Sequence, residues 1–266
     1  MKTLVYSEFE RLWRRKWFWL LVLCTPVLVY STGIYIQHTL RIPVKDLSKI
    51  FIVAGLRENL YLICNFAVAT LVAAVFTEEF RSGQLRLLFV RRFTRGQIFW
   101  SKLLVVNTSI LLLLIVYAVS SQVIVVFWKF SHNINGTDIF GQIWSQVFEY
   151  YGWAFASLLA ISSLYSFIAM CSKSVTYAIG ICMTYNLGVL LFDPLYMKLA
   201  TLFSSIPLLK NLIPFLLIPY LQYKGLDQSL IWNWSVNGAI VIAVLFHLIL
   251  FTGWAYRRFT TDDYLY

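Results

Sequence analysis

The feature that most restricts this chain is a series of long stretches without a charged residue. Six of them approach or exceed the ~20 helical residues needed to cross a hydrocarbon core of ~30 Å. They predict membrane spans at residues 17–38, 59–77, 103–128, 150–171, 175–193 and 232–256. Helices are expected because lipid offers the backbone no hydrogen-bonding partners. We therefore expect an all-α integral membrane protein, a single domain over residues 1–266 with six transmembrane helices.

Composition and charge agree with a membrane protein. The chain is 60% hydrophobic and only 13% charged, whereas soluble domains carry about 25% charged residues. The formal net charge of +10 does not point to nucleic acid, because the basic residues lie at the ends of apolar stretches. That placement favours contact with lipid headgroups and a fixed orientation in the membrane.

Orientation follows from the distribution of lysine and arginine. With the N-terminus in the cytoplasm, the cytoplasmic segments hold 14 of these residues and the outer segments hold 8. The positive-inside rule then places both termini in the cytoplasm of a cell-membrane protein.

Two regions outside the spans have patterns of their own. Residues 1–16 combine apolar residues at three- and four-residue steps with arginines on other sides, which predicts an amphipathic interfacial helix. A plain basic flank of the first span is the alternative. Residues 196–224 hold two apolar runs too short to cross, which predicts a pair of re-entrant or interfacial helices. An apolar loop packed on the bundle is the alternative there.

Residues 78–101 form a charged segment with an apolar stripe. Leu85, Leu88 and Phe89 share one helical face, and Ser82 and Gly83 permit a turn just before it. The pattern predicts a short amphipathic helix at the cytoplasmic mouth of the bundle. Such a helix docks either on lipid or into a protein groove, and the pattern leaves both open.

The same segment resembles the type 2 ABC-transporter permeases. Glu79, Gly83, Leu85, Arg95 and Lys102 match positions of that family's motif. Gln84 stands where threonine is usual and Arg92 where proline is usual. The resemblance implies a cytoplasmic coupling helix between spans two and three that docks on an ATP-hydrolysing subunit. The implied contact residues are Glu79, Gly83, Gln84, Leu85, Leu88, Arg92 and Arg95. For Arg92 a headgroup anchor, and for Glu79 an ion pair with a nearby arginine, are the alternatives.

The resemblance also implies a function. The chain would be the non-catalytic permease subunit of an exporter, assembled with two ATPase subunits and a second permease copy or related paralogue. ATP and Mg would bind the partner ATPase, because this chain has no GxxxxGK[ST] pattern. In the family that the chain resembles, export is the commoner activity, and it includes export that confers antimicrobial peptide resistance. No catalytic or metal site is expected, since the chain has no HExxH or GxSxG motif and no Cys/His cluster.

The cargo is less constrained by the sequence. Few ionisable groups lie within the predicted spans, which disfavours a proton-coupled mechanism. The many aromatic residues suit an amphipathic or hydrophobic substrate, such as a peptide, a drug or a lipid-like molecule. Asn65, Tyr185 and Asn186 are candidates for the substrate pathway, with interhelical packing as the alternative. A membrane scaffold or sensor without transport, or a membrane-embedded lipid-modifying enzyme, are the alternative functions.

Overall fold

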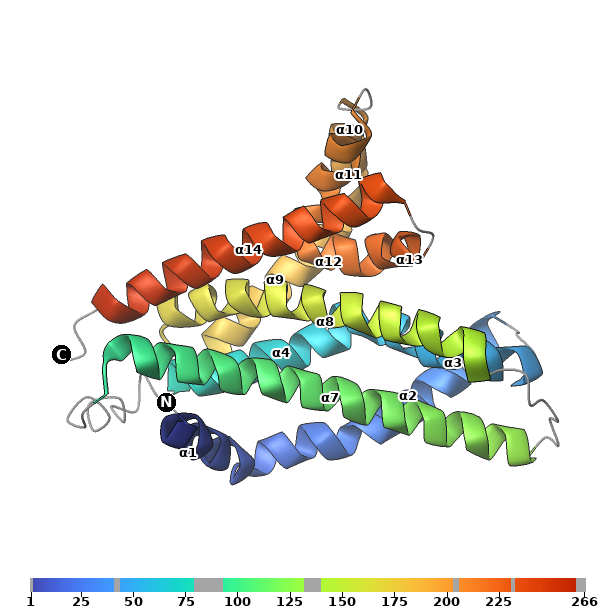
Figure 1. Ribbon diagram of the computed structural model, residues 1–266, viewed down its shortest axis with the longest axis horizontal. Helices are drawn as coiled ribbons and strands as arrows, with labels where there is room; N and C mark the ends of the chain where they lie inside the picture. The colour runs from blue at the N-terminus through green and yellow to red at the C-terminus, as the bar shows by residue number, and fades with distance from the viewer. Residues whose placement is uncertain are drawn as a thin grey trace.

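The computed structural model describes residues 2–40, 44–78, 93–131, 140–202, 206–230 and 233–261. Within these ranges every regular element is a helix and there is no strand. The long helices run side by side as a bundle, with α1 and the end of α14 at one end (Figure 1).

The N-terminal helix lies against the bundle and does not extend from it. Helix α1 spans Lys2–Trp13, and its buried residues Leu4, Glu8 and Leu12 are spaced four apart on the face that packs on α7. After a short break, α2 runs from Lys16 to Leu40. The sequence predicts an amphipathic helix here, and the helix observed buries one face that includes a carboxylate.

The next span is one helical rod with two wide turns. It comprises α3 (Val44–Asn59), the π-helical turn η1 (Leu60–Cys64), α4 (Asn65–Val72) and the π-helical turn η2 (Ala73–Glu78). A π-helix bonds each N–H to the carbonyl five residues back, and π-turns are frequent at functional sites. The rod begins well before residue 59, because Arg57 and Glu58, whose charges set that predicted boundary, continue the helix.

Three further long elements complete the first part of the bundle. Helix α7 spans Arg95–Ser131 and α8 spans Phe140–Cys171, so both begin earlier than the uncharged stretches on which their predictions were based. Helix α9 spans Val175–Leu191, and its N-cap is Ser174, whose side chain accepts a hydrogen bond from the Tyr177 amide at 3.2 Å.

Short helices fill the region between α9 and the last long helix. They are α10 (Asp193–Leu202), α11 (Pro207–Phe215), α12 (Ile218–Tyr220), the π-turn η3 (Leu221–Gly225) and α13 (Leu226–Ser229). Proline stands in the first turn of α10, α11 and α12, where its missing N–H costs nothing. Helices α10 and α11 pack on each other and project from the bundle (Figure 1), and α11 also contacts α14 (Trp234–Thr261).

Five helical stretches of the described chain are long and apolar enough to cross a membrane. They are Lys16–Thr39, Ile50–Thr77, Arg95–Trp128, Trp144–Cys171 and Trp234–Thr261. Helix α9 is apolar but shorter, since Asp193 opens the next helix soon after its end.

The outer faces of these helices explain why the chain needs lipid. On α7 the apolar side chains of Leu111, Ile115 and Val119 are 43–57% exposed and lie on one stripe at four-residue spacing. Inside the bundle, Ala154 of α8 and Ala239 and Ala243 of α14 are fully buried, and these two helices pack on each other. Small residues let helix backbones approach closely, as is usual in membrane bundles. The protein is therefore a multi-pass membrane protein.

Candidate functional site

Most of the predicted coupling segment lies outside the described residues. This holds for Glu79, Gly83, Gln84, Leu85, Leu88 and Arg92. The seventh predicted contact residue, Arg95, begins α7, and its Nη1 donates a hydrogen bond to the Thr260 carbonyl at 2.7 Å. The end of the segment is thereby tied to the last turn of α14.

The start of the segment is tied to a different helix. Thr77, in the second wide turn, is fully buried, and its Oγ1 donates to the Ala169 carbonyl of α8 at 3.0 Å. The described residues that flank 79–92 are therefore fixed to two different helices, Thr77 to α8 and Arg95 to α14. Both attachments lie at the end of the bundle that carries α1 (Figure 1).

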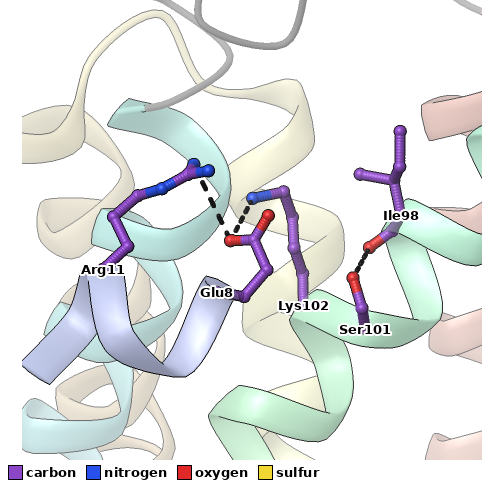
Figure 2. Close-up of polar contacts among 5 residues, drawn as sticks. All are labelled: Glu8, Arg11, Ile98, Ser101 and Lys102. Carbon is purple, nitrogen blue, oxygen red and sulfur yellow. Dashed lines mark hydrogen bonds and ion pairs between the residues drawn. The ribbon is translucent and has the colours of Figure 1, made fainter. Parts of the chain in front are cut away.

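A buried ion pair lies further along α7 from Arg95. Lys102 Nζ is 3.1 Å from Glu8 Oε2, and the two side chains are only 1% and 2% exposed. Arg11 Nη1 approaches the same carboxylate oxygen at 3.8 Å (Figure 2). Removing one member of such a pair strands a charge in a low-dielectric site, which is strongly destabilising. Helices α1 and α7 are thus held together at this end of the bundle.

A second polar assembly, here called the amide cluster, lies within the bundle. Its members Asn65, Ser157, Asn186 and Gln222 are each at most 1% exposed. Asn65 Nδ2 donates to Gln222 Oε1 at 2.6 Å, and Gln222 Nε2 donates back to Asn65 Oδ1 at 3.2 Å. The reciprocal pair joins the second span to the short-helix region, 157 residues apart in sequence.

Two further helices contribute to the amide cluster. Gln222 Nε2 also donates to Ser157 Oγ of α8 at 3.2 Å. Asn186 of α9 accepts at Oδ1 from the Tyr165 hydroxyl at 2.9 Å and from Asn65 Nδ2 at 3.5 Å. Four separate segments therefore meet at uncharged polar groups, in surroundings where an unpaired polar atom costs several kcal/mol.

The wide turns place the central pair of the cluster. Asn65 directly follows η1 and Gln222 lies within η3, and these two π-turns contact each other. Because a π-turn holds one residue more than an α-turn, it shifts the direction of the side chains that follow it by about 100°. The local backbone therefore determines that Asn65 and Gln222 face each other.

The family of the chain is shown by a match over most of its length. The family model described as ABC-2 family transporter protein matches residues 4–189, from α1 through α9. The chain belongs to this family. A search of the curated proteins finds no match for it.

Membership makes the chain a transmembrane ABC-transporter permease, the membrane subunit of a transporter. Among the described residues of the permease, no group of three or more His, Cys, Asp or Glu side chains could hold a metal. The match ends at Val189, so that Gln222 and the short helices around it belong to the part of the permease that the family model does not cover.

The structure brings together only part of what the sequence predicts. Asn65 and Asn186 meet in the amide cluster, whereas Tyr185 is one residue away on α9, faces another side and is partly buried against the core. Sequence reasoning missed Gln222, Ser157 and Tyr165. Gln222 carried a signal, since it is an amide near the end of the second apolar run, residues 211–223.

Glu8 was also missed at the end that carries α1. Its signal was its register, because it stands four residues from both Leu4 and Leu12 on the buried face of α1. A carboxylate on an apolar stripe indicates a buried cationic partner, and Lys102 is that partner.

Proposed function

We propose that this permease is the membrane half of an ATP-driven exporter of an amphipathic or hydrophobic molecule. Two ATPase subunits, which bind ATP and Mg, drive it, and it works with a second permease copy or a related paralogue. The chain crosses the membrane six times, with α9 as the fifth crossing, and both termini are cytoplasmic. Residues 196–224, from within α10 to η3, form the re-entrant or interfacial pair.

One observation carries the coupling part of this proposal, namely that both flanks of residues 79–92 are fixed to other helices. Thr77 is bonded to α8 and Arg95 to α14, while Lys102 joins α7 to α1. A force applied to residues 79–92 by an ATPase subunit would therefore pass to several helices at once. A flexible flank would dissipate that force instead.

The residues between the flanks supply the chemistry for docking. Leu85, Leu88 and Phe89 provide an apolar stripe of an expected helix, and the arginines around it provide charge that fixes orientation. Docking of an amphipathic helix in a groove of a partner is a standard mode of recognition.

The amide cluster supports an amphipathic cargo. It offers uncharged donors and acceptors within an otherwise apolar bundle, so it suits a molecule with polar groups on an apolar body. We place Asn65, Asn186 and Tyr185 along the cargo's path, with conformational change exchanging their present partners for groups of the cargo.

Co-purification tests the coupling role. The permease is co-expressed with a candidate partner ABC ATPase that co-purifies with it, and the Leu85→Glu/Leu88→Glu double variant is expected to lose the ATPase from the complex. The matched control is Leu87→Glu, the same substitution on the opposite side of the expected helix. Thermal unfolding checks that each variant folds.

Two outcomes would overturn this coupling role. One is full retention of the ATPase by the double variant, and the other is equal loss in the Leu87→Glu control.

Labelling of Gln84→Cys in a background without the four native cysteines tests the topology, because reaction with an impermeant reagent from outside would place the segment on the wrong side. Stimulation of ATP hydrolysis across a panel of peptides, drugs and lipids then identifies the cargo.

A further inference from the structure

A polar pocket of about 460 Å³ opens at the end of the bundle opposite α1. Its volume lies within the usual range for small-ligand sites. The residues that line it come from α3, η1, η3 and α13, and they are Arg57, Glu58, Tyr61, Tyr223, Lys224, Asp227 and Gln228. Figure 1 shows that α3 and α13 both lie at this end. It is distinct from the amide cluster and from the end that carries α1.

Four of the charges here are already paired with each other. Arg57 Nη2 lies 2.6 Å from Asp227 Oδ2, and Lys224 forms an ion pair with Asp193 beside the pocket. Burial raises the pKa of the Asp227 carboxyl, an effect that the nearby Arg57 guanidinium opposes. The hydrogen bond from Lys224 to Asp193 is the main reason that the pKa of the lysine amine is raised. Both cations in the wall are thus neutralised locally.

Glu58 is the carboxylate of the pocket wall that belongs to neither of these two ion pairs. Its side chain is exposed, and within the described residues it forms no ion pair. With Asp193 counted, the pocket gathers two cations and three carboxylates, so its net charge is −1. An incoming positive charge is therefore favoured over a negative one.

Two tyrosine rings stand beside this carboxylate. Tyr61 and Tyr223 have ring centroids 5.6 Å apart in a T-shaped arrangement, and Tyr61 is three residues from Glu58 on the same helical face. The Tyr223 ring already accepts one ammonium, since Lys224 Nζ lies 5.7 Å from its centroid. Tyrosine faces attract ammonium groups, particularly where a carboxylate supplies a further charge.

We propose that this pocket binds an organic ammonium group, held between the Glu58 carboxylate and the rings of Tyr61 and Tyr223. The ammonium belongs either to a cargo molecule or to the headgroup of a lipid. As a cargo site the pocket rests on the proposed function, and it then selects amphipathic molecules that carry a positive charge.

The position of the pocket links it to the amide cluster. Asn65 Nδ2 donates to the Tyr61 carbonyl at 2.8 Å, and Tyr223 directly follows Gln222. A ligand held against the rings of Tyr61 and Tyr223 therefore contacts residues of both π-turns that place the central pair of the cluster. Binding of a ligand in the pocket would therefore act on the positions of Asn65 and Gln222, the polar groups next to it on the proposed path.

Binding to the purified permease alone tests the proposal. Choline is the probe, and its uncharged isostere 3,3-dimethyl-1-butanol is the reference, measured by saturation-transfer NMR on the full chain in phosphatidylglycerol nanodiscs. Choline is expected to bind and the isostere is not. The Glu58→Gln variant should weaken choline binding about tenfold, because it removes the coulombic attraction to the quaternary ammonium. Tyr223→Leu should weaken binding more than Tyr223→Phe, which keeps the ring.

The control is Glu10→Gln, which removes a carboxylate from α1 at the opposite end and should leave binding unchanged. The proposal is overturned if choline and the isostere bind equally, or if Glu58→Gln and Tyr223→Leu both bind as the unchanged chain does while unfolding at its temperature. In phosphatidylcholine nanodiscs, loss of choline binding assigns the pocket to lipid headgroups, and retained binding assigns it to a soluble ligand. Because no ATPase is present, these results stand apart from the test of coupling.

Discussion

The bundle holds two groups of buried polar side chains that differ in charge, an ion pair at the end that carries α1 and the uncharged amide cluster. At the end that carries α1, one carboxylate is held by a lysine and an arginine, all on α1 and α7. In the amide cluster, neutral amides and hydroxyls from four segments share reciprocal hydrogen bonds. A buried charge loses far more than a buried amide when its partner is removed. The ion pair therefore commits α1 and α7 to one arrangement, whereas the amides can exchange partners at small cost.

The largest effect is expected from breaking the ion pair. Lys102→Met should lower the free energy of unfolding by about 3–5 kcal/mol, because Glu8 is then a buried charge with Arg11 as its only remaining counter-charge in Figure 2. Denaturant unfolding in detergent micelles measures this change. The Glu8→Leu/Lys102→Met double variant should recover most of the loss, since both members of the fully buried pair are removed and Arg11, whose side chain is 29% exposed, keeps access to water. A single variant as stable as the unchanged chain would contradict the account.

A smaller effect is expected within the amide cluster. Asn65→Leu should cost about 1–2 kcal/mol, since it leaves the Gln222 amide without its main partner. A double-mutant cycle with Gln222→Leu should give a coupling energy between about 0.6 and about 1.7 kcal/mol, which are the average and the largest value measured for hydrogen bonds between membrane helices. Strict additivity of the two substitutions would show that the pair carries no stabilisation of its own.

Removal of a single hydroxyl should cost less again. Tyr165→Phe keeps the buried ring and removes only the hydrogen bond to Asn186, so a loss of about 0.5–1.5 kcal/mol is expected. Tyr6→Phe is the matched control, because that side chain is 72% exposed and should leave the unfolding midpoint in place. Equal shifts in both variants would argue against a specific role for the buried hydroxyl.

The smallest effect should come from an exposed ion pair on the same helix as Glu8. Glu10 of α1 pairs with Arg14, the residue just past the end of the helix, and the two side chains are 45% and 78% exposed. Glu10→Ala is expected to change the free energy of unfolding by at most about 0.5 kcal/mol. Its comparison with Glu8→Ala, two residues away, isolates the effect of burial. A large loss in Glu10→Ala would remove the basis of that comparison.

The sequence was informative where composition decides the structure. Uncharged stretches and the resemblance in residues 79–102 were sufficient to predict a helical membrane protein of the ABC-2 type, and the family match confirms that recognition. Helix ends were harder, because charged residues such as Arg57 and Lys102 stay helical when partners neutralise them. A count of uncharged residues therefore marks apolar segments and not the ends of helices.

The site shows the same limit more sharply. Asn65 and Asn186 attracted attention as amides in apolar stretches, but their meeting with Gln222 depends on the π-turns η1 and η3. Periodicity of 3.6 residues cannot reveal such turns, since each moves the following side chains to a new direction. Glu8 and Lys102 are likewise 94 residues apart, and only the packing of α1 on α7 joins them.

The paired wide turns of the second span have a consequence for how its sequence can change. Because η1 and η2 bracket the eight residues of α4, the span is divided into sections with separate rotational registers. Loss of one residue from η1 would rotate Asn65 by about 100° relative to α3, while loss of one residue from η2 would rotate the residues that follow it relative to α4. Insertions or deletions in one wide turn would therefore change the direction of the side chains in one section of the span and leave the other sections in contact with their present neighbours.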